Sequence, residues 1–109
     1  MSPAPRACAV VHQGGIGTTG QTLRAGRPTL CVPFSHDQFD NGARVARLGA
    51  GRVLPRSRYN AASAVRELGE LLGEASYAQD AARVGSIVRR EDGARVACDA
   101  LEELLMRVA

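Results

Sequence analysis

The sequence predicts an α/β domain in which a small parallel sheet is followed by a helical C-terminal tail. Two apolar runs, at 7–11 and 29–32, are typical of strands buried on both faces, because polar residues do not alternate within them. A glycine-rich segment and a helical stretch separate these runs, and a connection of this kind joins parallel strands. After residue 60 the apolar residues recur at helical spacing, which predicts the tail.

The first half of the chain alternates strands with helices. Helices are predicted at 18–25 and from about 38 to 48, and glycine follows each of them, as it does at many helix ends. The strand at 29–32 lies between these helices, and a third, short strand is predicted at 52–54. The elements therefore make two consecutive strand–helix–strand units.

Three further helices are predicted after residue 60. Asn60 can cap the first of them. The buried face of that helix would hold Val65, Leu68 and Leu72. Ser76 and Gln79 have the spacing of a capping box for the second helix. The second helix would bury Tyr77, Ala81, Val84 and Val88.

Asp92 and Gly93 predict a turn, after which a last helix completes the chain. Its core-packing stripe would consist of Ala94, Ala97, Leu101, Leu104, Leu105 and Val108. Two or three strands beside five helices are too few for a doubly wound domain. We therefore expect residues 1–109 to be the second half of such a domain, truncated at its N-terminal side.

Composition narrows the class of protein. The 109 residues suffice for one small domain, and 45% hydrophobic with 23% charged residues is an ordinary globular balance. The sequence contains neither an apolar run long enough for a membrane span nor the apolar core of a signal peptide. Its three cysteines are isolated, which argues against a disulfide framework and a thiolate metal site. These observations predict a soluble, cytoplasmic protein without a metal centre.

Charge is unevenly distributed along the chain. Residues 1–59 carry eight arginines against two aspartates, whereas residues 60–109 carry six arginines against nine acidic residues. A positive half suggests an anionic ligand, although a solvated arginine-rich surface would give the same count. Nucleic acid is disfavoured as that ligand, because the arginines are scattered and the chain has only four aromatic residues and no tryptophan.

The segment after the first strand has the features of a phosphate-binding loop. A histidine ends the strand, glycines allow a tight turn, and hydroxyl residues begin the helix, whose N-terminus offers free N–H groups and a partial positive charge. The candidate residues for binding a diphosphate are His12, Gly14, Gly15, Gly17, Thr18 and Thr19.

The same segment also contains a GxGxxG pattern over residues 15–20, the fingerprint of dinucleotide-binding proteins. In that fingerprint an acidic residue belongs near the end of the second strand. Here Asp37 follows the apolar run only after Pro33-Phe34-Ser35-His36. A dinucleotide-dependent oxidoreductase is therefore the less favoured alternative.

A second polar cluster follows the second strand and should lie on the same rim as the glycine loop. Asp37 and Gln38 combine acceptors with a donor amide, which suits sugar hydroxyls. Asp37 could instead only cap the following helix. His36 next to Asp37 resembles a catalytic pair, but no nucleophile accompanies it, so we assign no catalytic residue in this chain.

Four blocks together resemble the donor-binding signature of the UDP-glycosyltransferase family, in particular its bacterial antibiotic-type and sterol-type members. The blocks are 12–19, 23–28, 32–34 and 37–41, and the likeness extends over roughly residues 7–107. It implies the C-terminal domain of the GT-B arrangement, in which two Rossmann-like domains face a cleft.

The resemblance implies that His12 and the residues from Gly14 to Thr19 hold the diphosphate of a nucleotide-sugar donor, and that Asp37 and Gln38 hold the sugar. It implies an inverting, metal-independent transfer to a hydroxyl of a small hydrophobic acceptor, with no cofactor. The base and the acceptor pocket would belong to an absent N-terminal domain. The full-length parent would then be a glycosyltransferase, and this fragment alone inactive.

One departure from the family concerns the ribose. Many members have a glutamate eight positions after the signature histidine, whereas Gly20 stands there in this chain. The departure puts selectivity for UDP in doubt and makes a deoxyribose donor such as a dTDP-sugar plausible. A second interpretation is a standalone nucleotide-sugar-binding module that a partner chain completes.

Overall fold

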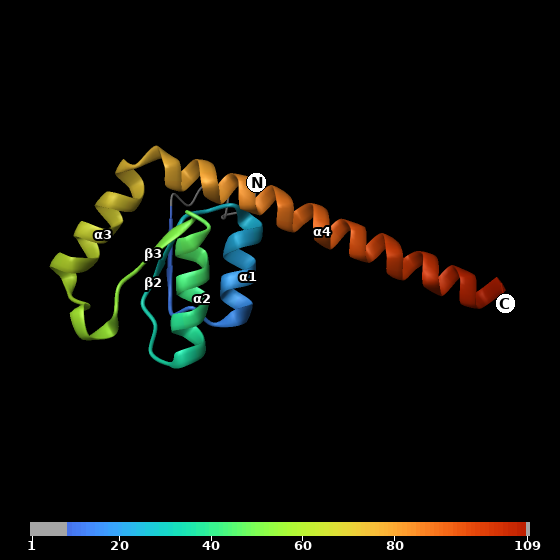
Figure 1. Cartoon of the computed structure of the whole chain (residues 1–109), viewed down its shortest axis with the longest axis horizontal. Helices are drawn as coiled ribbons and strands as arrows, with labels where there is room; N and C mark the ends of the chain where they lie inside the picture. The colour runs from blue at the N-terminus through green and yellow to red at the C-terminus, as the bar shows by residue number, and fades with distance from the viewer. Residues whose placement is uncertain (1–8, 109) are drawn as a thin grey trace.

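The structure is a computed structural model that describes residues 9–108, apart from the side chains of residues 94, 96, 97 and 108. Its elements follow in the order β1 (Val10–His12), α1 (Ile16–Ala25), β2 (Thr29–Cys31), α2 (His36–Arg47), β3 (Gly51–Val53), the short 3-10 helix η2 (Arg56–Arg58), α3 (Ala61–Gly73) and α4 (Ala75–Val108). Both predicted strand–helix–strand units and the helical tail are confirmed (Figure 1).

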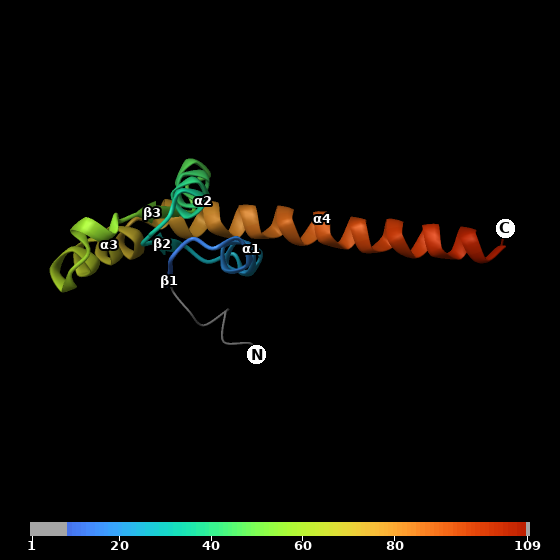
Figure 2. The same ribbon diagram turned by 90° about the horizontal axis from the view of Figure 1, so that it is seen from below.

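The three strands form one parallel sheet in the order β1-β2-β3. Helices α1 and α2 cover one face of this sheet, and α3 covers the other (Figure 2). Helix α4 packs on α1 and α3 and crosses the end of the sheet opposite to the β1–α1 and β2–α2 loops (Figure 1). The carboxyl ends of the strands, where open α/β sheets bind ligands, are therefore not covered by α4.

The central strand β2 is buried on both faces, as predicted for this apolar run. Leu30 belongs to a cluster on the α3 side that includes Leu71, while Val45 and Ala81 form a second cluster with Ala50. The same prediction is wrong for β1, because Val11 is 48% exposed. Strand β1 lies at a sheet edge, and α3 packs on β2 and β3 instead. Residues 7 and 8 of that run lie outside the described residues.

Helix α3 begins as predicted but presents a different face to the sheet. The Asn60 side chain accepts a hydrogen bond from the Ser63 N–H at 2.8 Å, which confirms the cap. Val65 and Leu72 were expected in the core but are 70% and 55% exposed. Leu71 is buried in their place, since the sheet lies on the side of the helix that carries Leu68 and Leu71.

The start of α4 corrects the predicted capping box. Helix α3 ends at Gly73, and Glu74, with extended backbone, is the single residue before α4 begins at Ala75. Ser76 therefore lies inside the first turn of the helix and does not precede it. The predicted buried face of this helix is otherwise confirmed. Ala81 and Val84 are buried, and Tyr77 and Val88 are partly buried.

The predicted turn at Asp92 and Gly93 is also wrong, because α4 continues without a break to Val108. The Asp92 carboxylate accepts hydrogen bonds from Arg24 of α1 at 2.7 Å and from Arg95 at 3.3 Å. These ion pairs hold the carboxylate on the helix surface, where it does not compete for backbone N–H groups. A glycine inside a helix lowers the stability of the helix by about 1 kcal/mol relative to alanine. A long helix forms despite this loss.

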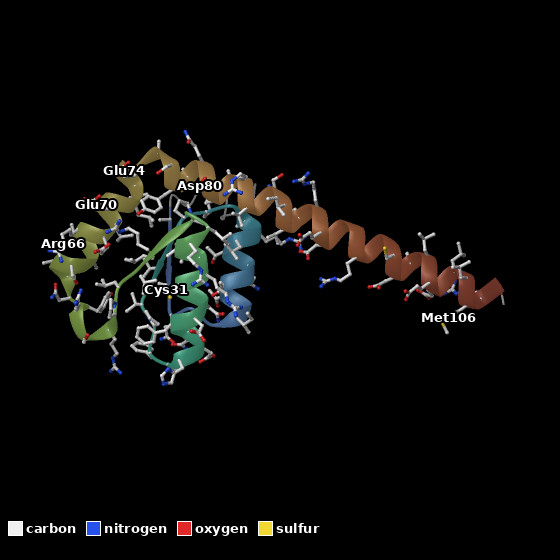
Figure 3. The ribbon with its side chains drawn as sticks, viewed as in Figure 1. Cys31, Arg66, Glu70, Glu74, Asp80 and Met106 are labelled. Atoms are coloured by element: carbon white, nitrogen blue, oxygen red, sulfur yellow. The ribbon has the colours of Figure 1, made fainter. Side chains whose placement is uncertain are left out.

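Beyond Gly93 the helix extends away from the rest of the domain (Figure 1). Leu101, Leu104 and Leu105 were expected to pack into the core but are 57–68% exposed. Met106 points away from the domain at the far end (Figure 3). The side chains of the remaining predicted stripe residues, Ala94, Ala97 and Val108, are outside the described set. Among the described helices, none is long and apolar enough to cross a membrane.

One guanidinium connects the sheet to both C-terminal helices. Arg52 of β3 donates to the carboxylate of Glu67 on α3 and, at 2.9 Å, to the hydroxyl of Tyr77 on α4. The hydrogen bond with Glu67, and secondly that with Tyr77, raises the pKa of Arg52 above its ordinary value. These contacts fix the orientation of α3 and α4 relative to the edge strand.

A close approach of α4 to α1 generates the first prediction. A Cβ at Gly85 would lie 2.7 Å from the Cα of Gly26 and 2.9 Å from the carbonyl oxygen of Leu23. Gly85→Ala should therefore destabilise the protein by about 1–3 kcal/mol, the usual cost of overpacking, although alanine favours helices. Urea denaturation followed by circular dichroism measures this change in the free energy of unfolding.

Gly69→Ala is the matched control, because a Cβ at Gly69 of α3 would meet no atom within 4 Å. This variant should be stabilised by about 0.5–1 kcal/mol, the helix preference of alanine over glycine. If both variants change the free energy of unfolding in the same direction, the close packing of α4 on α1 is wrong.

Candidate functional site

The glycine loop between β1 and α1 is packed too closely for a side chain. Gly14 is buried and has a φ of 94°, which favours glycine. A Cβ at this position would lie 2.8 Å from the Sγ of Cys31 and 2.8 Å from the carbonyl oxygen of Gln38. Cys31 is at the centre of the domain (Figure 3). The loop backbone therefore rests directly on β2 and α2.

A hydrogen bond ties this loop to α2. The Nδ2 of Asn41 donates to the carbonyl oxygen of Gly14 at 2.8 Å. The contact brings the β1–α1 and β2–α2 loops together, so the prediction that both polar clusters share one rim is confirmed. We did not predict this role of Asn41 from the residues alone. The only feature of the sequence that pointed to Asn41 was its position in the block 37–41, which resembles the glycosyltransferase signature.

His12 ends β1 with its imidazole oriented by the loop. Its Nδ1 accepts the N–H of Gly14 at 2.9 Å, so in the neutral ring the proton resides on Nε2. The Nε2 atom is buried and has no hydrogen-bond partner among the described residues. Burial lowers the pKa of His12 below its ordinary value of 6.5. The side chain is therefore a neutral donor whose N–H is unsatisfied.

The amino end of α1 supplies further donors. The first hydrogen bond of this helix runs from the Thr19 N–H to the Gly15 carbonyl at 2.8 Å, so the amides of Gly17 and Thr18 have no intrahelical carbonyl. A Cβ at Gly15 or Gly17 would meet nothing within 4 Å, which leaves the backbone open to a ligand. The first turn carries no acidic residue. An anion is therefore favoured here by both the amides and the helix dipole.

The two threonines of this motif lie in different places. Thr18 is exposed at the helix start. Thr19 is 6% exposed, and its hydroxyl has no partner among the described residues. Its side chain lines a hollow of about 230 Å³ between α1 and α2, which it shares with Val45 and Leu48. The structure thus places the Thr19 hydroxyl apart from the open loop, although its backbone remains in the first turn.

The second cluster forms the start of α2, and Ser35 is the N-cap. The Oε1 of Gln38 accepts the N–H of Phe34 at 2.7 Å and that of Ser35 at 3.3 Å. The Gln38 oxygen is therefore occupied, and its NH₂ group is what remains for a ligand. Ser35 and Gln38 form the capping box of this helix, and Asp37 lies in its first turn.

Asp37 is an exposed carboxylate on the rim. Its Oδ1 accepts a hydrogen bond from the Ser35 hydroxyl at 2.8 Å. This hydrogen bond is the main cause that lowers the pKa of Asp37 below its ordinary value, with smaller contributions from backbone N–H groups and His36. Asp37 is thus a fixed, ionised acceptor. It lies on α2, not at the end of β2, where the dinucleotide fingerprint would require an acid.

A hollow of about 240 Å³ adjoins His12 at the carboxyl end of the sheet. It is lined by Val11, His12, Gln13, Val32, Phe34 and Tyr59. We did not predict Phe34 and Tyr59 as site residues. Phe34 comes shortly after the end of β2, which was the available signal, whereas Tyr59 follows η2 and carried none. No group of three histidine, cysteine or acidic side chains in the described part of the chain could hold a metal ion.

Solved structures define the class of protein to which this fold and site belong. The glycosyltransferase of kitacinnamycin matches 92% of this chain and 26% of its own, with a TM-score of 0.79 and 24% identity, which shows the fold. Glycosyltransferase VinC, solved in complex with dTDP, matches 82% of this chain and 24% of its own, with a TM-score of 0.73 and 28% identity. The chain has the fold of a GT-B glycosyltransferase C-terminal domain, as the resemblance implied.

Residues 4–100 match the family described as Erythromycin biosynthesis protein CIII-like, C-terminal domain, and the chain belongs to this family. It is 38% identical over 100 residues to O-mycaminosyltylonolide 6-deoxyallosyltransferase of Streptomyces fradiae, covering 91% of this chain and 24% of that enzyme. It is 40% identical over 93 residues to sterol 3-beta-glucosyltransferase of Kluyveromyces lactis, covering 85% of this chain and 8% of that enzyme. The chain thus spans a quarter or less of these relatives.

The lowered pKa of His12 makes stability depend on pH. The unfolded chain takes up a proton on this histidine near pH 6.5, whereas the folded chain does so only at lower pH. Unfolding is therefore coupled to proton uptake in this window, and the free energy of unfolding should rise with pH up to about 6.5. The slope contributed by His12 is at most about 1.4 kcal/mol per pH unit.

Urea denaturation between pH 5 and 7.5 measures this dependence. His12→Gln should flatten the slope, whereas His36→Gln, at the exposed histidine of α2, should leave it in place. An unchanged slope in His12→Gln would contradict the burial of a neutral imidazole.

Proposed function

We propose that this chain is the donor-binding part of a cytoplasmic, inverting and metal-independent glycosyltransferase, which transfers a sugar from a nucleotide diphosphate to a hydroxyl group. The observation that carries this proposal is the unsatisfied Nε2–H of His12 next to the open amino end of α1. Membership of a glycosyltransferase C-terminal family supports it. The diphosphate and sugar sites that we assign follow from the geometry of the two loops and from membership of this family.

The diphosphate is the ligand we assign to the glycine loop. During transfer the acceptor oxygen bonds to the anomeric carbon while the bond from that carbon to the diphosphate breaks, so the diphosphate gains negative charge. The unpartnered His12 N–H and the free amides of Gly17 and Thr18 belong to one strand–loop–helix segment that also contains Gly15, and fixed donors that bind such a charge stabilise transition states strongly. Gly14 holds the loop in place, and Thr19 contributes through its backbone in the first turn.

The sugar is the ligand we assign to the start of α2. The ionised Asp37 accepts hydrogen bonds from sugar hydroxyls, and the NH₂ of Gln38 donates one. The Gln38 oxygen cannot take part, because Phe34 and Ser35 already donate to it. Asp37 is therefore the principal hydrogen-bond acceptor that we assign to the sugar, and Gln38 is a donor.

We further propose dTDP as the nucleotide. Gly20 stands where the resemblance implies a ribose-binding glutamate; it is exposed, and a Cβ there would meet nothing within 4 Å. No carboxylate is therefore available at this position to bind a ribose 2′-hydroxyl, which dTDP lacks. The spinosyn rhamnosyltransferase SpnG, 28% identical, and VinC were both solved with this nucleotide.

The acceptor and the base that removes its proton would come from the remainder of a longer enzyme. The matched relatives are named for a sterol and for O-mycaminosyltylonolide. These names support the small hydrophobic acceptor with a reactive hydroxyl that we propose.

Calorimetric titration of the chain with dTDP and dTDP-glucose tests this function. His12→Ala should weaken the binding of both ligands by about 10–100-fold, the scale of a lost hydrogen bond to a charged group. Asp37→Ala should weaken only dTDP-glucose, because dTDP has no sugar for this carboxylate to hold.

Asp40→Ala is the matched control, since Asp40 is another exposed aspartate of α2. It should bind both ligands like the unmodified chain. If His12→Ala keeps full affinity for dTDP, the diphosphate site is wrong, and equal losses for both ligands in Asp37→Ala would make Asp37 a structural residue.

A further inference from the structure

The hollow between α1 and α2 has apolar walls that both helices supply. The two helices cover the same face of the sheet (Figure 2), and the hollow of about 230 Å³ lies between them. Its carbon surface comes from Ile16, Leu23, Val45 and Leu48. Ile16 is 77% exposed and Leu48 is 41% exposed, so a small molecule can enter the hollow from solvent. Apolar concavities with a few polar groups are the usual form of small-molecule sites.

The hollow also contains a polar group without a partner. The side chain of Thr19 lines it, yet the Thr19 hydroxyl is buried and has no hydrogen-bond partner among the described residues. The hydroxyl of Thr22, the other buried threonine of α1, instead donates to the Thr18 carbonyl oxygen at 2.9 Å. A buried hydroxyl without a partner destabilises a protein, and a ligand atom that accepts its proton removes this destabilisation. The hollow is therefore suited to a ligand with an acceptor group.

A positive charge stands at the same hollow. Arg44 of α2 lines it, is exposed, and forms no ion pair within the part of the chain that the structure describes. None of the described acidic side chains lines the hollow. A carboxylate is the acceptor that suits both groups, because one of its oxygens can accept the Thr19 proton while the other pairs with the guanidinium.

The volume of the hollow limits the size of its ligand. Sites for drug-sized molecules span about 300–1,000 Å³, and this hollow is smaller. We propose that it binds a small monocarboxylate with an apolar body, of the class of medium-chain fatty acids. The carboxylate contacts Thr19 and Arg44, and the carbon chain lies along the apolar walls.

This site is distinct from the donor site. His12, Asp37 and Gln38 do not line the hollow. Asn41 contacts both regions, because it lines the hollow and donates to the Gly14 carbonyl oxygen. The inference therefore does not rest on the proposed function, and binding of dTDP tests that function separately.

Titration of the ¹⁵N-labelled chain with sodium octanoate, followed by two-dimensional NMR of the backbone amides, tests this site. Octanoate should shift the amide signals of residues 19–23 and 44–48, and these shifts give its dissociation constant. Octylamine and 1-octanol have the same chain without the carboxylate. Octanoate should bind about fivefold more tightly than either of them, the scale of an ion pair at a surface.

Arg44→Gln should weaken the binding of octanoate by roughly threefold to fivefold, because it removes that ion pair. Thr19→Val removes the hydroxyl and nearly keeps the shape of the side chain, and it should weaken binding by roughly fivefold. Arg47→Gln is the matched control, since Arg47 is an exposed arginine of the same helix that does not line the hollow. It should bind octanoate like the unmodified chain. The amide spectrum of each variant verifies that it is folded.

The inference is overturned if octanoate shifts only signals outside the hollow, such as those of the exposed leucines of α4. Equal binding of the three amphiphiles, or equal effects of Arg44→Gln and Arg47→Gln, would exclude the carboxylate assignment. Displacement of octanoate by dTDP would make the hollow part of the donor site, which also contradicts a separate site. If dTDP does not bind at all, the donor function fails while the octanoate titration still decides the hollow.

Discussion

The arrangement of this domain depends on one constraint, the direct packing of the Gly14 backbone between Cys31 and the first turn of α2. Because no side chain stands between them, the Asn41 amide reaches the Gly14 carbonyl, and the Gly14 N–H reaches the His12 ring. One close contact therefore orients the histidine, opens the amino end of α1 and brings Asp37 to the same rim. A larger residue at Gly14 would disturb all three.

The diphosphate site that we propose contains no fixed positive side chain among its assigned residues. A histidine with an unpaired N–H and a helix start without acidic residues provide hydrogen-bond donors whose proton positions do not vary around neutral pH. The negative groups of the rim are separated from them, since Asp37 is held by Ser35 on α2. Hydrogen-bond donors and an acceptor carboxylate thus lie on adjacent loops, which fits the nucleotide-sugar ligand that we propose.

Local signals in the sequence were sufficient for the strands, the glycine-terminated helices and the Asn60 cap, because short-range geometry determines these features. Tertiary contacts determined the buried face of α3, the continuity of α4 and the contacts between loops. Leu71 and Leu72 are equally apolar, and only the position of the sheet determines that Leu71 is buried while Leu72 is 55% exposed. Asp92 and Gly93 favour a turn in isolation, but the ion pair with Arg24 depends on a residue 68 positions away. The roles of Asn41 and Phe34 likewise depend on loops that meet only after folding.

The two halves of α4 differ in what stabilises them. The half up to about Asp92 is anchored to α1 and to Arg52, so its amide protons are protected by the same cooperative unit as the sheet. In the half that carries Leu101 and Leu104, the described side chains are exposed, and the helical state depends on intrinsic propensity and on the Glu103–Arg107 pair. An isolated helical segment of this length is marginal in water. Hydrogen exchange there therefore proceeds through local fraying, at a free-energy cost that is independent of global unfolding.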